Sequence, residues 1–288
     1  MADFIKTLQN KWRYGTLLNR IIFINIGVFL LLHLLTFVFG LMNSRYAQTV
    51  LEVVELPSSL SLLLRQPWSL ITYMFAQYDI FHLLFNMLWL YWFGQIFLLT
   101  DTPKRMTALY LFGGIAGGVL FMLSYALLPV FSGSQGMLIG ASASVIAIVT
   151  ATAILHPDYK VMLFLIGEIS VKWIAVITIA IDFLSISGDN SGGHIAHIGG
   201  ALMGVCFAIA QKRGIDITKH FNRAIDRTVD IFRRKHSHSA KANGRRLSDE
   251  EQLDILLDKV RRSGYGSLTR TEKQQLMDLS HKINTKKH

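Results

Sequence analysis

The chain alternates between long apolar runs and short polar connections. The apolar runs predict six membrane-spanning helices, at residues 20–42, 82–100, 105–128, 142–155, 172–187 and 194–211. A hydrocarbon layer of about 30 Å needs about 20 helical residues, so the fourth and fifth segments are short. A segment that begins below the surface, inside a protein cavity, can be shorter. The pattern therefore predicts an all-α membrane protein with a bundle of six transmembrane helices.

The connection between the first two spans, residues 43–81, is not simply polar. It contains several leucines, an isoleucine and Trp68. Apolar loops with aromatic side chains are typical of the membrane–water interface. We therefore expect this loop to lie partly in the outer interface rather than fully in water.

Apolar residues continue at helical spacing after the last span, at Phe221, Ile225, Val229 and Phe232. Lysines and arginines surround them. An apolar stripe bordered by basic residues predicts an amphipathic helix on an anionic membrane surface. A plain surface helix of a small domain is the alternative.

Two helix-start signals follow a polar linker at residues 236–246. Ser248-Asp-Glu-Glu251 and Thr269-Arg-Thr-Glu272 both fit a capping box. They predict a small helical hairpin at 248–284 that buries little by itself. The expected organisation is an N-terminal segment 1–19, a six-helix domain 20–211, a basic amphipathic linker 212–244 and the hairpin unit 245–288.

Composition agrees with a membrane protein that has a polar tail. Of the 288 residues 51% are hydrophobic and 17% are charged, and residues 106–155 contain no Asp, Glu, Lys or Arg. The net charge is +10 and much of it follows residue 211. Directly after an apolar segment, such charge favours anionic lipid headgroups as the partner rather than nucleic acid. The single cysteine, Cys206, rules out an internal disulfide, and no cleavable signal peptide is in view.

Basic residues in the short connections predict the orientation. They gather on one side of the membrane, at Lys6, Lys11, Arg13, Arg20, Lys104, Arg105, Lys160, Lys172, Lys212 and Arg213. The other side has only Arg45 and Arg65, in the long first loop. Both termini and the C-terminal hairpin are therefore expected to be cytoplasmic.

Polar groups inside a membrane are costly and usually functional. Most of the polar residues within the predicted spans lie near the start of a helix. The second, fourth and sixth spans all run from outside to inside, so these residues are expected on the same side of the membrane. The group consists of His82, Asn86, Ser142, His194 and His197. We expect these side chains to lie at one level, near the outer end of the bundle.

Those residue types suit nucleophilic catalysis. A serine hydroxyl becomes reactive when a histidine accepts its proton. Ser142 follows Gly140, so backbone can approach closely, and it begins a helix whose free N–H groups favour an oxyanion. His82 and Asn86 share one helix face and could add donors.

Structural roles compete with this interpretation. A serine in a membrane helix commonly bonds its own backbone. Ser144 has the same chemistry as Ser142 but is turned about 200° away. His33 has no polar partner nearby in the sequence and is expected to be structural.

Residues 20–211 resemble the rhomboid intramembrane proteases. The resemblance rests on His82-Leu-Leu-Phe-Asn86, Gly140-Ala-Ser142 and Ala196-His197-Ile-Gly-Gly200 with Gly204. Trp68 also falls where the family has a loop tryptophan. Each motif alone is weak, whereas the set in this order on the expected helices is specific.

The resemblance implies a Ser–His dyad without a catalytic aspartate, with Ser142 as nucleophile and His197 as base. It also implies that His82 and Asn86 donate to the oxyanion, that Gly140 belongs to the nucleophile motif and that His194 supports the site. Asp182 matches an acidic position of some relatives, and its role is open, with a structural hydrogen bond as the simplest one.

Two positions depart from the family pattern. Ala143 follows the serine where the family usually has glycine, and Ser69 follows the loop tryptophan where it usually has arginine. The first departure removes no catalytic group, and the second bears on the stability of the first loop. Small residues four apart, as at Gly200 and Gly204, predict close helix packing.

The expected function is an intramembrane serine endopeptidase of the inner-membrane, bacterial type, without metal or organic cofactor. Its substrates would be single-pass membrane proteins. One rival is a non-catalytic rhomboid-like protein that binds membrane clients, but such proteins typically lose the serine or the histidine. A transporter is a second rival. Many transporters have inverted repeats, and the sequence shows no clear one. The sequence does not indicate the oligomeric state.

Overall fold

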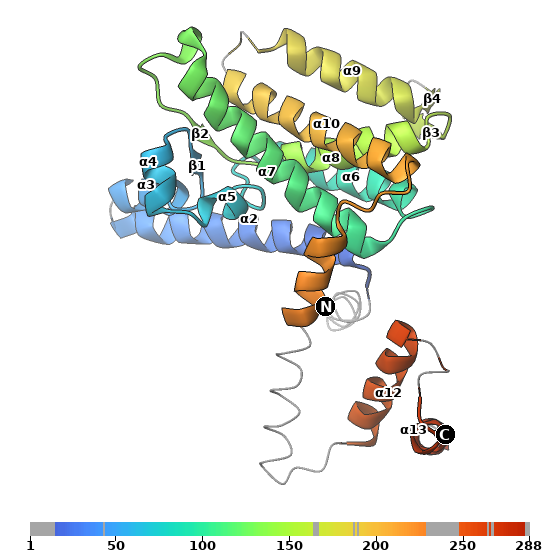
Figure 1. Ribbon diagram of the computed structural model, residues 1–288. Coiled ribbons are helices and arrows are strands. Elements are labelled where there is room, and N and C mark those ends of the chain that lie inside the picture. Colours follow the sequence, from blue (N-terminus) through green and yellow to red (C-terminus); the bar gives the residue numbers. More distant parts are fainter. Residues whose placement is uncertain are drawn as a thin grey trace. The chain divides into compact units, whose positions relative to one another are not determined.

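The computed structural model describes residues 15–42, 44–163, 167–186, 188, 190–228, 248–263, 265 and 268–285 (Figure 1). The chain forms two compact units, residues 1–222 and 223–288. The long helices of the first unit are α2 (Leu17–Met42), α6 (Ile80–Phe97), α7 (Pro103–Leu127), α8 (Ser142–Leu155), α9 (Val171–Leu184) and α10 (Ser191–Lys212).

Four of these helices, α2, α6, α7 and α10, are long and apolar enough to cross a membrane. Helix α8 is apolar but shorter, and α9 has 14 residues. All six helices begin and end within a few residues of the predicted segments. How many of them cross the membrane stays a prediction.

Helix α8 lies at the centre of the first unit, between α6, α7, α9 and α10 (Figure 1). Most of its side chains are buried, and none of them is charged. Helices α7 and α10 pack against it and against each other, while α9 contacts mainly α8 and α10. A short helix surrounded by protein needs no lipid-facing length, which explains the short fourth segment.

The first loop is built from short helices: α3 (Ser44–Glu52), α4 (Leu60–Arg65) and α5 (Ser69–Thr72). Trp68 Nε1 donates to the Val53 carbonyl at 2.8 Å, which closes the loop on itself. Strand β1 (Leu56–Pro57) pairs antiparallel with β2 (Met137–Leu138), just ahead of Ser142. The loop therefore braces the segment that leads into α8.

A second two-stranded ladder joins α8 to α9. Strands β3 (Lys160–Leu163) and β4 (Gly167–Ser170) pair antiparallel, with Lys160 opposite Ser170. The prediction of an all-α chain is wrong in this detail and at β1–β2. Strands of two to four residues offer too few positions for an alternating pattern to be visible in the sequence.

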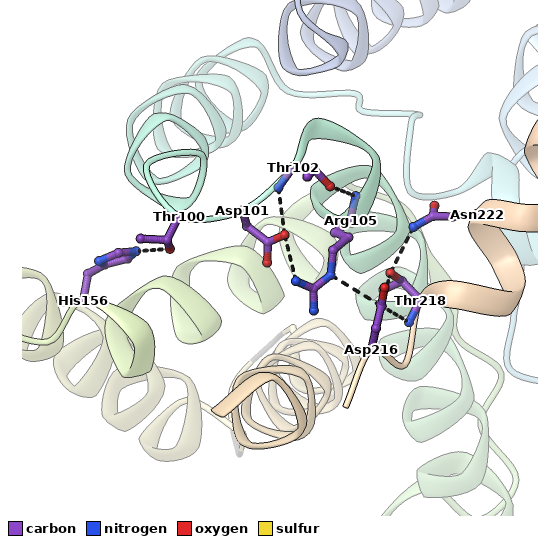
Figure 2. A network of polar contacts seen from close by, with 8 residues as sticks. All are labelled: Thr100, Asp101, Thr102, Arg105, His156, Asp216, Thr218 and Asn222. Carbon is purple, nitrogen blue, oxygen red and sulfur yellow. Dashed lines mark hydrogen bonds and ion pairs between the residues drawn. The ribbon is translucent and has the colours of Figure 1, made fainter. Parts of the chain in front are cut away.

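A polar network lies at the ends of the bundle where α6, α8 and α10 finish (Figure 2). Arg105 contacts Asp101 at 3.0 Å and Asp216 at 3.4 Å, which ties the start of α7 to the chain beyond α10. Asp216 in turn accepts from Thr218, and Thr100 bonds His156 at 2.9 Å. Burial opposes ionisation of Asp216, but the Thr218 hydrogen bonds and the Arg105 charge together lower its pKa. The network anchors the chain as it leaves α10.

Residues 219–228 are helical, in agreement with the start of the predicted amphipathic helix. The Phe221 ring packs edge-on against Phe112 of α7, with centroids 5.2 Å apart. Ile225 is 38% exposed. Val229, Phe232 and the rest of the basic linker from residue 229 onward lie outside the described residues.

The second unit contains α12 (Asp249–Ser263) and α13 (Arg270–Thr285). Leu256, Leu268 and Leu279 form its small buried cluster. At the start of α13, Thr269 N donates to Glu272 Oε2 at 2.8 Å and Glu272 N donates back to Thr269 Oγ1 at 3.3 Å. This reciprocal pair is the predicted capping box.

Candidate active site

Ser142 is the first residue of α8, and the backbone before it has a conformation that suits glycine. Gly140 has a φ of +134°, which side chains on L residues rarely adopt. Its N–H donates to the Tyr73 carbonyl at 3.0 Å, so the loop after α5 holds this turn in place. Helix α8 therefore begins with the Ser142 hydroxyl and the first helical N–H groups, which have no partner within the helix.

The Ser142 hydroxyl meets His197 of α10. Ser142 Oγ and His197 Nε2 are 2.6 Å apart, and the His197 side chain is 16% exposed. The two residues are 55 positions apart in the sequence. The geometry suits proton transfer from the hydroxyl to the imidazole.

Close packing of α8 and α10 allows Ser142 and His197 to come into contact. A Cβ added at Gly200 would lie 2.1 Å from the Ala143 carbonyl oxygen, so only glycine fits there. Gly204, one turn further, faces the Ala147 carbonyl in the same way. The prediction from the small-residue spacing is confirmed: the two backbones touch just beyond the Ser142–His197 pair.

The other ring nitrogen of His197 faces Asp182 of α9. His197 Nδ1 lies 2.8 Å from Asp182 Oδ1, and His194 Nδ1 lies 2.9 Å from the same oxygen. Asp182 is 6% exposed. His194 thus lies beside His197 and shares its carboxylate partner, and Asp182 accepts hydrogen bonds from both rings.

Asp182, His194 and His197 are also residue types that bind metal ions, and their ligand atoms lie within 4.8 Å of one another. Ligands at about 2.0–2.1 Å from a tetrahedral zinc ion are about 3.3 Å apart. The two nitrogen–oxygen contacts are shorter than that and have the length of hydrogen bonds to a charged group. The arrangement therefore fits a carboxylate shared by two imidazoles better than three ligands around one ion.

The His82 ring of α6 lies beside Gly140, in the turn that leads to Ser142. A Cβ at Gly140 would lie 3.2 Å from His82 Cε1 and 3.7 Å from Ser142 Oγ, so the ring and the hydroxyl border the same small space. Asp79 caps the start of α6 by accepting from the His82 N–H at 2.7 Å. The cap fixes the first turn of the helix that carries His82.

Asn86 lies one turn further along the same face of α6 and is 7% exposed. Its Nδ2 donates to Gln77 Oε1 at 2.8 Å. Gln77 Nε2 donates onward to Asn25 Oδ1 of α2 at 3.2 Å. Gln77 and Asn25 were not predicted from the sequence, although an asparagine inside the first apolar segment is a visible signal.

Ser144 is fully buried and its hydroxyl points away from His197. A Cβ at Gly114 of α7 would lie 2.6 Å from Ser144 Oγ. Among the described residues Ser144 Oγ has no hydrogen-bond partner. The structure thus places Ser142, and not Ser144, against the histidine.

Comparison with known proteins agrees with this architecture. Residues 64–213 match the rhomboid domain, and residues 239–282 match a family of unknown function (DUF6576). RHOMBOID-like protein 12, mitochondrial, of Arabidopsis thaliana is 31% identical over 156 residues, which cover 50% of this chain and 46% of that protein. Presenilin-associated rhomboid-like protein A, mitochondrial, of Danio rerio is 30% identical over 137 residues, covering 46% and 34%.

The fold and the matched domain define a rhomboid-type membrane protein, and this chain belongs to the rhomboid family. The chain aligns with less than half the length of both relatives. Each alignment covers half of this chain or less.

Proposed function

We propose that the protein is an intramembrane serine endopeptidase that cuts transmembrane segments of membrane proteins. The observation that carries the proposal is the 2.6 Å contact between Ser142 Oγ and His197 Nε2. The contact joins two helices inside an apolar bundle, where an unneeded polar pair would be costly. Retention of both residues argues against a non-catalytic client-binding protein.

In the proposed reaction His197 Nε2 takes the Ser142 proton as the Oγ attacks the scissile carbonyl carbon. A carbon–oxygen bond forms, and the carbonyl electrons move to its oxygen. When the tetrahedral intermediate collapses, His197 gives the proton to the leaving amine and the peptide carbon–nitrogen bond breaks. Water then attacks the acyl-enzyme by the same route and regenerates the serine.

The developing oxyanion needs donors that are already in place. We propose three sources of such donors: the N–H groups at the start of α8, the His82 ring beside Gly140, and the Asn86 amide one turn further along α6. The Asn86 amide has two N–H groups and gives one to Gln77, so the second is available. Gly140 contributes by leaving room, since any Cβ there would crowd His82.

Proposed substrates are single-pass membrane proteins with small residues and poor helicity at the cleavage site. A hydrogen-bonded helix shields its carbonyl groups, so local unwinding exposes the bond to Ser142. The residues present suffice for this hydrolysis with neither a metal nor an organic cofactor.

We further propose that the protein lies in the cell inner membrane with both termini cytoplasmic. The excess of lysine and arginine in the short connections supports this orientation. Labelling of single cysteines in a Cys206→Ser background tests it, since a cysteine at position 135 should react from outside and one at position 240 should not. The basic segment 212–244 would bind anionic lipid headgroups.

A fluorophosphonate probe tests the proposed chemistry because it reacts with an activated serine. Wild-type protein in detergent should be labelled on the peptide that contains Ser142. Ser142→Ala should be unlabelled, and Ser144→Ala, the matched control two residues away, should label at the wild-type rate. Folded wild-type protein that binds a membrane substrate but neither reacts with the probe nor cuts would support the client-binding alternative instead.

A further inference from the structure

The carboxylate of Asp182 lies behind the histidine of the proposed dyad. We propose that Asp182 is a positioning residue for His197, and that His194 holds the Asp182 carboxylate in place. The inference rests on the proposed function and adds a third and a fourth group to it. It also departs from a site made of serine and histidine alone.

Tautomer chemistry is the first reason. Nε2 of His197 can accept the Ser142 proton only while Nδ1 carries the ring hydrogen. That hydrogen needs an acceptor, and Asp182 Oδ1 lies 2.8 Å from Nδ1. An ionised carboxylate only accepts, so the contact selects the tautomer whose lone pair faces Ser142.

Charge is the second reason. When His197 takes the serine proton it becomes an imidazolium inside an apolar bundle. Asp182 is 6% exposed, and its carboxylate contacts His197 Nδ1 directly. Its negative charge therefore lies against that cation with little water between them. Such a charge stabilises the ion pair that forms during attack.

His194 explains how the carboxylate keeps its orientation. It precedes His197 by one turn on the same face of α10, and its Nδ1 donates to the same Asp182 oxygen at 2.9 Å. The two imidazole rings are nearly perpendicular, with centroids 5.8 Å apart. Two donors from one rigid helix therefore fix one oxygen, while among the described residues Oδ2 has no partner.

Asp182→Asn tests the proposal because it keeps the shape and removes the charge. With a transmembrane substrate, kcat should fall by about 10²–10⁴ while KM stays near the wild-type value. His194→Ala should give a smaller fall in kcat. Thr178→Val is the matched control, since Thr178 lies one turn before Asp182 and donates to the Ile174 carbonyl of its own helix.

The ring nitrogens of His197 provide a second readout that does not need a variant. In wild-type protein with ¹⁵N-labelled histidine, neutral His197 should carry its hydrogen on Nδ1. A hydrogen on Nε2, or full kcat in a folded Asp182→Asn protein, would overturn the inference and leave the proposed function standing. A wild-type protein that neither cuts nor reacts with the probe would instead remove the proposed function.

A separate set of contacts leads to a second inference, at the oxyanion side. We infer that Gln77 and Asn25 orient the Asn86 amide so that it presents an N–H group to the oxyanion. The three side chains are buried, with exposed fractions of 1%, 0% and 7%. They come from the loop after α5, from α2 and from α6.

The direction of this chain of amides is set at its far end. Asn25 Nδ2 donates to the Ile21 carbonyl at 3.0 Å, and a carbonyl can only accept. Asn25 Oδ1 must then face Gln77, and it accepts from Gln77 Nε2. Gln77 therefore turns Oε1 toward Asn86, which has to donate.

A tyrosine supports the same direction from the side. Asn25 Nδ2 also donates to the Tyr110 hydroxyl at 3.2 Å. The hydroxyl hydrogen is used on the Met74 carbonyl at 2.7 Å, so the hydroxyl oxygen is free to accept. Reversing any one amide would place like groups together, and this resolves the nitrogen–oxygen ambiguity of each side chain.

A double-mutant cycle separates orientation from general stability. Gln77→Ala should lower kcat by about tenfold, part of the 10²–10³ that one oxyanion donor contributes. In an Asn86→Ala background the same change should cost almost nothing, because its target is gone. Asn222→Ala, in the network of Figure 2, is the control and should leave kcat unchanged.

If Gln77→Ala does not fold, Asn25→Ala replaces it in the same double-mutant cycle. Losses in kcat that multiply in the double variants would show that Gln77 and Asn25 act independently of Asn86, and would overturn the second inference.

Discussion

The α carbon of Gly200 lies directly against the carbonyl of Ala143, so closely that a Cβ would come within 2.1 Å of the oxygen. A real side chain would force α8 and α10 apart just below the Ser142–His197 contact. Gly200→Ala should therefore destabilise the protein by about 1–3 kcal/mol and lower activity more than stability alone accounts for. Thermal unfolding and cleavage rates measure the two effects.

Gly27→Ala is the matched control for that substitution. It lies in α2, where a Cβ would meet no atom within 4 Å. It should leave both unfolding temperature and cleavage unchanged. An equal loss at both positions would mean that the effect comes from helix backbone rather than from the α8–α10 contact.

Removal of the proposed oxyanion donors should lower turnover in a protein that still folds. Asn86→Ala and His82→Ala should each reduce kcat by about 10²–10³, because each donor acts on charge that develops in the transition state. His33→Ala is the control, since His33 bonds the Phe29 carbonyl of its own helix. Unchanged kcat in both variants would remove these residues from the site.

Periodicity was enough to predict the helix positions, whereas the residues of the candidate site were predicted from motifs that resemble those of the rhomboid family. Hydropathy predicts the helices because lipid requires long apolar runs. Ser142 and His197 were singled out because their motifs, in this order on the expected helices, resemble those of the rhomboid family. The structure brings both residues together across 55 positions.

The partners of those residues could not be predicted in the same way. Asp182 reaches His197 because α9 packs beside α10, and this lateral placement is not coded by hydropathy. Gln77 and Asn25 belong to a loop and to the first helix, which meet only in the folded chain. Contacts between different elements leave no periodic signal in any one of them.

The C-terminal unit should be dispensable for the chemistry. All proposed site residues, from Asn25 to His197, lie inside the unit that ends at Asn222. Deletion of residues 245–288 should leave kcat in detergent within about twofold of wild type, since this part of the chain contains no group of the site. Comparison of the truncated and full-length proteins on one substrate measures this, and loss of all activity would show that the unit belongs to the catalytic body.

Stability of the C-terminal unit should depend on pH through Glu272. The Lys259 hydrogen bond, together with the Thr269 capping bonds, lowers the pKa of Glu272 from 4.5 to about 2. Because this pKa is lower in the folded state, the ionised Glu272 carboxylate stabilises the folded state above pH 4.5. This stabilisation disappears as the pH falls toward 2. Glu272→Gln should therefore destabilise a 245–288 peptide near neutral pH and have little effect near pH 2.

Circular dichroism during thermal unfolding of that peptide measures the difference between the two forms. Glu250→Gln removes an exposed carboxylate of α12 and is the control, with the same small effect at both pH values. A Glu272→Gln effect that does not change between pH 7 and pH 2 would contradict the assigned interaction.

Cleavage of a model transmembrane substrate in proteoliposomes by wild type, Ser142→Ala and Ser144→Ala tests the central claim most directly. The two variants each lose a serine hydroxyl from the first turn of α8, but of the two serines only Ser142 contacts His197. The account predicts that wild type and Ser144→Ala cut the substrate and that Ser142→Ala does not. Cleavage by Ser142→Ala at the wild-type rate would contradict it.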